Sequence, residues 1–127
     1  MSVLVVCLFI AAAFAIFSKG PVGFAQSKLG GYDNKYPRDQ QAKLTGFGAR
    51  AVAAHQNSFE SLIIFAPAVL AALATNTTGE TIQNLAIIHV AARLAYHILY
   101  LVNIDLLRTL SWTIATLSSF SIIYLCI

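Results

Sequence analysis

One segment near the middle of the chain combines cationic, amide and acidic side chains with a long apolar run. Arg50, Asn57 and Glu60 lie within residues 50–60, and residues 61–74 that follow are almost wholly apolar. At the 100° turn per residue of an α-helix, these three side chains would share one face. Polar and charged groups at membrane depth are costly, so their presence indicates a functional site.

A second set of polar side chains follows further along the chain. Its members recur at helical spacing on one face of a predicted helix: His89, Arg93, Tyr96, His97 and Tyr100. Glu60 would lie about 18 Å from the start of its helix, and Arg93 about 15 Å from the end of an antiparallel neighbour, so the two charges match in depth. Because a buried charge needs a partner, we predict a Glu60–Arg93 ion pair or a shared network.

The chemistry of the combined set suits a small anionic ligand. Arginine side chains bind carboxylates bidentately, a glutamate accepts an ammonium group, and a tyrosine hydroxyl beside an arginine favours a thiolate over a thiol. A zwitterionic peptide with a thiol fits this inventory better than a proton path does, because a proton path would need acids at several depths. The candidate residues are Arg50, Asn57, Glu60, Arg93, Tyr96, Tyr100 and Arg108.

Composition indicates the elements that must position these residues. The apolar fraction is 58% and the charged fraction 10%, against roughly 45–50% and about 25% in soluble proteins. A membrane span needs about 20 apolar residues. Four segments meet this requirement: residues 3–18, 48–74, 82–102 and 106–127. The sequence therefore predicts a single all-α membrane domain over residues 1–127, a bundle of four transmembrane helices, in contact with the lipid bilayer.

The basic residues predict an orientation. Lys19, Lys28, Lys35, Arg38 and Lys43 gather between the first and second spans. Positive charge favours the cytoplasmic side, so this loop (residues 19–47) is predicted to be cytoplasmic, with both termini outside. The net charge of +3 is thus a topology signal, and the chain has no basic helix of the kind that binds nucleic acid.

The first span and the first loop carry further expectations. No basic residue precedes Val3, whereas Lys19 follows the apolar run, so we interpret this segment as a retained span rather than a signal peptide. Residues 40–47 are expected to extend the second helix into the cytoplasm. Cys7 and Cys126 lack metal-type spacing, and we expect neither a disulfide nor a metal site.

Two expectations concern the surroundings of the second and fourth spans. His55 points roughly opposite to Asn57 on the helix, so both faces of the second span carry polar groups. In a small four-helix protein, neighbouring subunits would most easily enclose both faces. Arg108 could extend to the lipid headgroups or turn back toward Tyr100. Trp112 and Tyr124 suit the aromatic belts at the membrane interfaces.

The order and spacing of these motifs resemble those of the MAPEG family, the membrane-associated proteins of eicosanoid and glutathione metabolism. The stretch from Ala54 to Glu60 resembles the family's A-[HQ]-x-N-x-x-E signature, and Ala92-Arg93 with Tyr100 resembles its second motif. Three further stretches resemble the bacterial branch of the family: Gly31-Tyr32-Asp33-Asn34, Pro37-Arg38 and Leu107-Arg108-Thr109-Leu110. The resemblance covers roughly residues 30–115 and implies a protein of the bacterial inner membrane.

The resemblance also implies a homotrimer that binds glutathione between neighbouring protomers near the cytoplasmic face. Asn57 and Glu60 would match glutathione contacts of the first motif, and Arg93 and Tyr100 those of the second. Arg108 would match the arginine that stabilises the thiolate. One position departs from the pattern: Ala53 stands where catalytic members carry an arginine, and Arg50 lies one turn earlier on the same face.

Two functions from different classes stay open. The first is a glutathione-dependent transferase or peroxidase acting on lipophilic electrophiles from the bilayer, with Arg108 stabilising the sulfur anion and Tyr100 donating a hydrogen bond. The second is a non-catalytic membrane subunit that binds lipid or joins a larger membrane complex, in which Asn57, Glu60 and Arg93 hold helices together. An Arg108 side chain turned toward Tyr100 favours the enzyme, and one turned to the headgroups favours the structural role.

Overall fold

The computed structural model describes residues 1–127 and consists of helices joined by turns. The helices are α1 (Ser2–Phe17), α2 (Lys19–Ser27), α3 (Pro37–Ala42), α4 (Phe47–Ala74), α5 (Glu80–Leu101) and α6 (Asp105–Tyr124). Four helical segments are long and apolar enough to cross a membrane: α1 together with α2, then α4, α5 and α6. The predicted class, an all-α membrane protein with four transmembrane helices, is confirmed.

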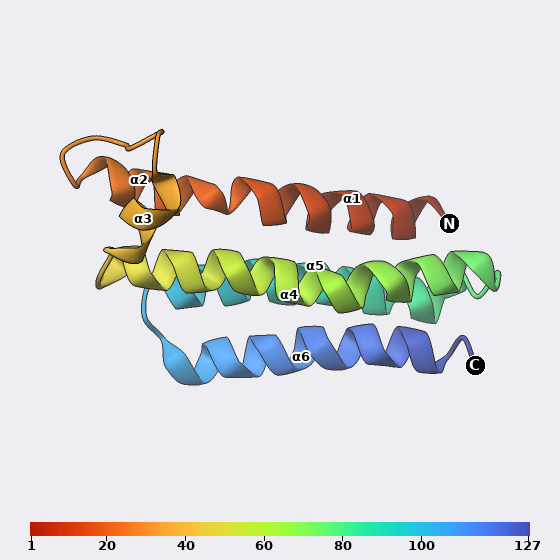
Figure 1. Cartoon of the computed structure of the whole chain (residues 1–127). Coiled ribbons are helices and arrows are strands. Elements are labelled where there is room, and N and C mark those ends of the chain that lie inside the picture. Colours follow the sequence, from red (N-terminus) through yellow and green to blue (C-terminus); the bar gives the residue numbers. More distant parts are fainter.

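The four long segments lie side by side, and the two chain termini end up at the same end of the bundle (Figure 1). Helix α1 packs against α4 and α5, whereas α6 packs against α5 and α4 from the other side. The turn between α5 and α6 and the small helices α2 and α3 lie at the opposite end from the termini. This end therefore gathers the polar residues of the first loop and the last turns of α5.

The apolar core lies toward the end that carries the termini. Nine buried residues form one cluster: Leu4, Cys7, Phe65, Ala68, Val69, Ala72, Ile82, Ala86 and Ile122. Alanine is frequent in this cluster, and small residues let helices approach closely where lipid removes the hydrophobic drive for association. Cys7 is a free thiol inside the cluster, and Cys126 packs against it from α6.

The prediction of a polar loop over residues 19–47 is wrong for its first nine residues, which form helix α2. The helix is interrupted only at Ser18, whose backbone keeps right-handed helical angles (φ −62°, ψ −9°). Pro21 explains both observations. Proline cannot continue the hydrogen-bond ladder of a helix, but it is tolerated in the first turn, where its missing N–H has no partner to lose. A break just before Lys19 turns residues 19–21 into such a first turn.

The expected helical extension of the second span over residues 40–47 is also wrong. Helix α3 ends at Ala42, and α4 begins separately at Phe47. Gly46 lies between them with φ +54° and ψ −125°, a conformation that favours glycine. Gly48 packs closely, because a Cβ atom there would lie 3.0 Å from Leu44. The chain therefore changes direction at Gly46 instead of continuing one long helix.

The remainder of the first loop is held by two glutamine side chains. The Nε2 atom of Gln26 donates to the carbonyl oxygen of Pro37 at 3.0 Å. Gln40 bonds twice to the loop: its Nε2 donates to Gly31 O at 2.8 Å, and its Oε1 accepts from the backbone N–H of Asp33 at 2.9 Å. These bonds fix the segment between α2 and α3 against both helices, so the loop has a defined structure without strands or long helices.

Candidate functional site

The structure joins the two polar sets through Asn57. The Nη1 atom of Arg93 donates to Asn57 Oδ1 at 2.8 Å, and the Nδ2 atom of Asn57 donates to Glu60 Oε2 at 3.2 Å. Arg93 is 6% exposed, whereas Glu60 is exposed. The predicted connection between Glu60 and Arg93 is therefore a network in which the amide of Asn57 accepts from the cation and donates to the carboxylate.

Four side chains on α5 and α6 form a row in which a pair of tyrosine rings lies between two arginines. The guanidinium carbon of Arg93 lies 4.2 Å from the centre of the Tyr96 ring, and that of Arg108 lies 4.4 Å from the centre of the Tyr100 ring. The two tyrosine rings meet edge to face at 5.7 Å. An arginine over an aromatic face is attracted by the ring quadrupole. Arg108 therefore turns back toward Tyr100, one of the two directions considered from the sequence.

A cavity opens beside these residues. Its volume is ≈ 230 Å³, and its lining comes from α4, α5 and α6: Asn57, Tyr96, Tyr100, Arg108, Thr109 and Trp112. Thr109 and Trp112 are absent from the sequence-based set of candidate residues. Trp112 follows Arg108 at i+4 and so shares its helix face, a signal that could have identified it. The sequence suggested an interfacial belt for Trp112 instead.

Three of the predicted residues lie beside this cavity rather than in its wall: Arg50, Glu60 and Arg93. Arg50 extends to the last turn of α5, where its Nη2 atom lies 3.5 Å from Leu101 O. Carbonyl groups at a helix C-terminus carry partial negative charge and attract cations. Glu60 reaches the cavity only through Asn57. The structure thus groups Asn57, Arg93, Tyr96, Tyr100 and Arg108 and leaves Arg50 at their edge.

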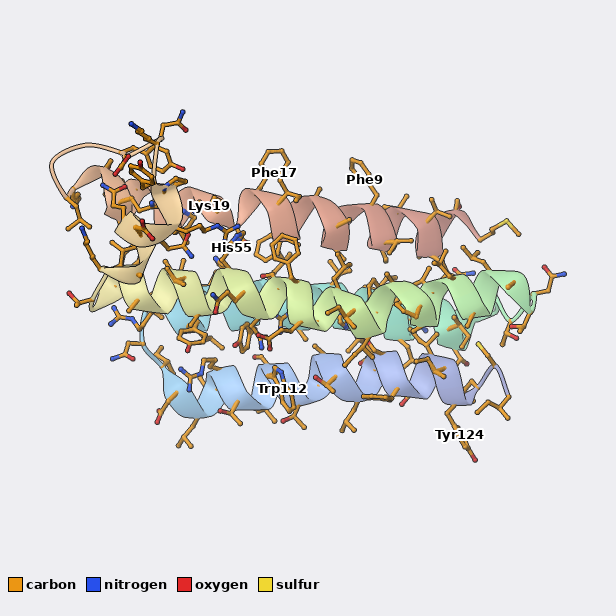
Figure 2. All side chains as sticks on the ribbon, in the orientation of Figure 1. Phe9, Phe17, Lys19, His55, Trp112 and Tyr124 are labelled. Carbon is orange, nitrogen blue, oxygen red and sulfur yellow. The ribbon has the colours of Figure 1, made fainter.

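The opposite face of α4 carries a second polar cluster. The Nδ1 atom of His55 lies 2.6 Å from Ser18 Oγ, and Lys19 Nζ donates to Gln41 Oε1 at 2.7 Å. Figure 2 shows Lys19 and His55 together between the first helical segment and α4, while Phe9 and Phe17 point away from the bundle. The prediction that polar groups lie on both faces of the second span is confirmed.

The other two histidines lie inside the bundle. His89 stacks on Phe65 with ring centres 3.9 Å apart, and its Nδ1 atom lies 2.9 Å from Ala115 O. His97 is 5% exposed and meets the Phe14 ring edge to face at 5.0 Å. These contacts are those of packing and interhelical bonding. No group of three or more His, Cys, Asp or Glu side chains could hold a metal ion.

The site offers binding and charge stabilisation. Guanidinium groups bind carboxylates or stabilise a sulfur anion, and the aromatic rings stacked on them help to fix their orientation. The side-chain amide of Asn57 can form a hydrogen bond to a peptide group of the ligand when that group replaces Glu60 as its partner. Arg108, two tyrosines and the Asn57 amide in the wall of one cavity, with Arg93 bonded to that amide, suit an anionic, peptide-like ligand.

Comparisons with known proteins identify the family of the chain. Searches of curated proteins and of solved structures give no match. A family model, described as the MAPEG family, matches residues 3–127, which is essentially the whole chain and extends well beyond the motif residues. The match includes all four membrane-crossing segments and every residue of the site. The chain is therefore a multi-pass membrane protein that belongs to the MAPEG family, whose members act in glutathione and eicosanoid metabolism.

Proposed function

We propose that the protein is a glutathione-dependent transferase or peroxidase of the membrane that acts on lipophilic electrophiles. The observation that carries this proposal is the position of Arg108: its guanidinium lies over the Tyr100 ring and lines the cavity with Asn57 and Tyr96. An arginine serving only the lipid headgroups would have no reason to turn inward. A guanidinium at a cavity that suits a thiol peptide supports thiolate activation.

The roles follow from the contacts. Arg93, Asn57, Glu60 and Tyr96 would bind the peptide, because a buried cation, an amide and a carboxylate lie within one bonded network. Arg108 would stabilise the sulfur anion, and the Tyr100 hydroxyl would donate a hydrogen bond to it. The thiol releases its proton to water, and the thiolate sulfur attacks the electrophilic atom of the second substrate, which reaches the site from the bilayer. The new carbon–sulfur bond replaces the bond to a leaving group, which departs as an anion, or the π bond of an activated alkene, whose other carbon takes up a proton.

A homotrimer with the ligand between protomers accounts for two further observations. The cavity of one chain, ≈ 230 Å³, lies below the roughly 300–1,000 Å³ of typical small-molecule sites, so one chain supplies part of a site. Helix α4 also presents polar clusters on opposite faces, around Asn57 and around His55. Neighbouring protomers on both sides of α4 would shield these clusters. The basic residues of the first loop support a cytoplasmic position for this end of the bundle, and the family resemblance supports a bacterial inner membrane.

The affinity for glutathione would be modest. Ala53 replaces the arginine that catalytic members carry, and Arg50 contacts Leu101 O instead of the cavity. One charged hydrogen bond is worth about 1.5–3 kcal/mol, which corresponds to roughly ten- to a hundredfold in affinity. We expect millimolar rather than micromolar binding.

The alternative function is that of a non-catalytic membrane subunit, which binds lipid or joins a larger membrane complex. The bond between Arg93 and Asn57 favours it, because this bond connects α5 to α4 and already satisfies one nitrogen of the buried cation. In this role the polar network is interhelical bonding of the kind that stabilises membrane bundles.

Equilibrium binding of glutathione to the purified protein in detergent distinguishes the two functions. Wild type, Arg93→Ala and Arg108→Ala would be titrated at one pH and temperature, and the ultraviolet absorbance of the thiolate would be followed. We expect Arg93→Ala to abolish saturable binding and Arg108→Ala to abolish the thiolate signal. Lys35→Ala removes an exposed cation and serves as the control, with binding unchanged.

Absence of wild-type binding at millimolar glutathione would overturn the enzyme proposal and support the non-catalytic subunit. Binding with no thiolate signal would support a carrier of glutathione rather than a transferase. The mass of the protein assembly, measured on the same samples and corrected for the bound detergent, tests the trimer.

A further inference from the structure

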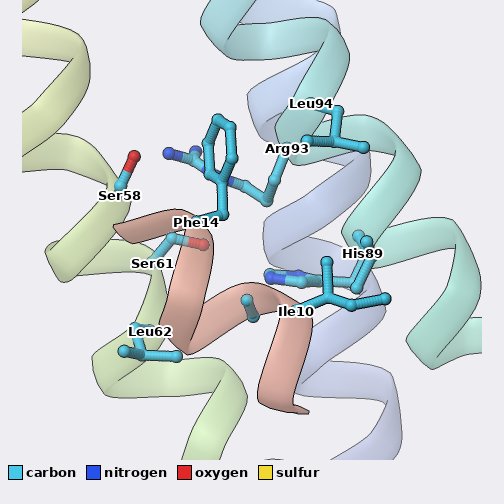
Figure 3. Close-up of a pocket in the computed structure, with 10 residues that line it drawn as sticks. Ile10, Phe14, Ser58, Ser61, Leu62, His89, Arg93 and Leu94 are labelled. Carbon is cyan, nitrogen blue, oxygen red and sulfur yellow. The ribbon is translucent and has the colours of Figure 1, made fainter. Parts of the chain in front are cut away.

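A second, smaller cavity lies deeper in the bundle, enclosed by α1, α4 and α5 (Figure 3). Its polar lining comes from Ser58, Ser61, His89 and Arg93, and apolar side chains such as Phe14 complete it. The cavity volume is ≈ 20 Å³. About 10–15 Å³ on this measure holds one water molecule, provided that two to four polar partners surround it.

Arg93, which lines this cavity, carries an unsatisfied donor. Its Nη1 atom is bonded to Asn57, but its Nη2 atom is buried and has no partner within the chain. The whole side chain is 6% exposed. Leaving a buried charged donor unpaired is costly, so a group outside the protein chain is expected at Nη2.

His89 offers the complementary acceptor. Its Nδ1 atom lies 2.9 Å from Ala115 O and 3.0 Å from Ser119 Oγ. A carbonyl oxygen can only accept, so Nδ1 carries the hydrogen. In a neutral imidazole the other nitrogen, Nε2, is then an acceptor. Figure 3 shows the nitrogen-bearing ends of His89 and Arg93 extending from α5 toward the same space.

We propose that this cavity holds one ordered water molecule, which accepts a hydrogen bond from Arg93 Nη2 and donates one to His89 Nε2. Its second hydrogen can be donated to a serine of α4: Ser61 lines the cavity, and Ser58 Oγ donates to Ala54 O at 3.1 Å and keeps its own lone pairs free to accept. The water thus has three partners, the usual number for a buried water.

The water makes His89 a positioning residue for Arg93. Two bonds and a stack fix the imidazole, because it is held by Ala115 and Ser119 of α6 and lies flat on Phe65 of α4. Through the water, this fixed ring holds one side of the guanidinium while Asn57 holds the other. The orientation of Arg93 against Asn57 and Tyr96, which line the larger cavity, then depends on α6 as well as on α4.

Two substitutions at His89 test the contacts of its two ring nitrogens separately. Glutamine places an amide where Nε2 lies, so His89→Gln keeps a partner for the water. Asparagine places its amide where Nδ1 lies, so His89→Asn keeps the bond to Ala115 and loses the water contact. The side-chain exchange rate of the Arg93 Nε–H with solvent, measured by nitrogen-15 NMR on the full chain in detergent, reports how firmly the guanidinium is held.

We expect crystal structures of the wild type and of His89→Gln, at a resolution that shows ordered water molecules, to contain one solvent peak between Arg93 and residue 89. The exchange rate should rise about tenfold in His89→Asn and stay within about twofold of wild type in His89→Gln. A dry cavity in the wild-type map, or equal exchange rates in the three proteins, would overturn the proposal. The wild-type map decides occupancy even if a variant does not fold. Neither readout uses glutathione, so the result stands apart from the proposed function.

Discussion

The two ends of the bundle are built in different ways. At the end that carries the termini, the helices meet through an apolar cluster in which Leu4, Ala68, Ala72 and Ala86 are fully buried. At the other end, the contacts are directed hydrogen bonds and arginine–tyrosine stacks around a cavity of ≈ 230 Å³. Close packing at one end fixes the helices, and this allows the other end to keep a polar cavity open.

The boundary between the two regions lies at His89 and Phe65. Their rings are parallel to within 2°, and Phe65 belongs to the apolar cluster whereas His89 lines the small cavity beside Arg93. The stack therefore connects the packed region to the polar one. A change confined to one region should leave the other largely intact, and the following variants test that separation.

The largest effect is expected from Ile122→Ala in the packed region. Ile122 is fully buried in the apolar cluster, and truncation leaves a cavity. We expect a loss of about 2–3 kcal/mol in unfolding free energy. This loss lies in the lower part of the range for soluble cores, because the side chain stays in lipid when the helices separate. Unfolding in mixed micelles measures it, with Ile63→Ala, at a site 72% exposed, as the matched control.

Ligand affinity per folded molecule should not change in Ile122→Ala. A matching loss of glutathione binding in the folded fraction would show that the two regions are coupled, and it would contradict the separation described above.

Arg108→Lys should act only in the polar region. Lysine keeps the charge but not the planar group that stacks on Tyr100. We expect the conjugation rate to fall roughly tenfold, since the cation near the sulfur is less well placed, while unfolding stability changes by less than about 0.5 kcal/mol. Tyr100→Phe is the companion variant: it keeps the ring under Arg108 and removes the hydroxyl. An unchanged rate in both would remove these residues from the mechanism.

Ser18→Ala tests the cluster on the other face of α4. The Ser18 hydroxyl lies 2.6 Å from His55 Nδ1, and its oxygen also lies 2.8 Å from Ala15 O. Loss of the interhelical bond should cost about 1 kcal/mol of unfolding free energy. Ser27→Ala removes an exposed hydroxyl that bonds only to its own helix and should cost less. Equal effects in the two variants would mean that the Ser18–His55 contact does not stabilise the fold.

The smallest effect is expected from Glu60→Gln. The side chain is exposed, and its amide oxygen can still accept from Asn57 Nδ2. We expect stability to change by less than about 0.5 kcal/mol. Glutathione affinity should fall by a few-fold through loss of the negative charge that accepts the ligand's ammonium group. Isothermal titration of both proteins measures the difference, and a fall of more than a hundredfold would show that Glu60, not Arg93, dominates binding.

Much of this molecule follows from its sequence, and the exceptions have identifiable causes. Apolar run lengths predicted the four spans, and 3.6-residue periodicity predicted that His89, Arg93, Tyr96 and Tyr100 share a face. The helix over Lys19–Ser27 escaped prediction because Gly20-Pro21 resembles a turn. Proline at the start of a helix and proline in a turn have the same local signature, so only the neighbouring packing distinguishes them.

The sequence determined the number of spans, the family and which polar side chains lie at matching depths, because these depend on composition, period and the rise of a helix. Only the tertiary structure decided that Asn57 lies between Arg93 and Glu60, that Arg50 contacts α5, and that Trp112 lines the cavity. Helical spacing gives an angle about one axis, whereas a contact between helices depends on how far each is rotated toward its neighbour.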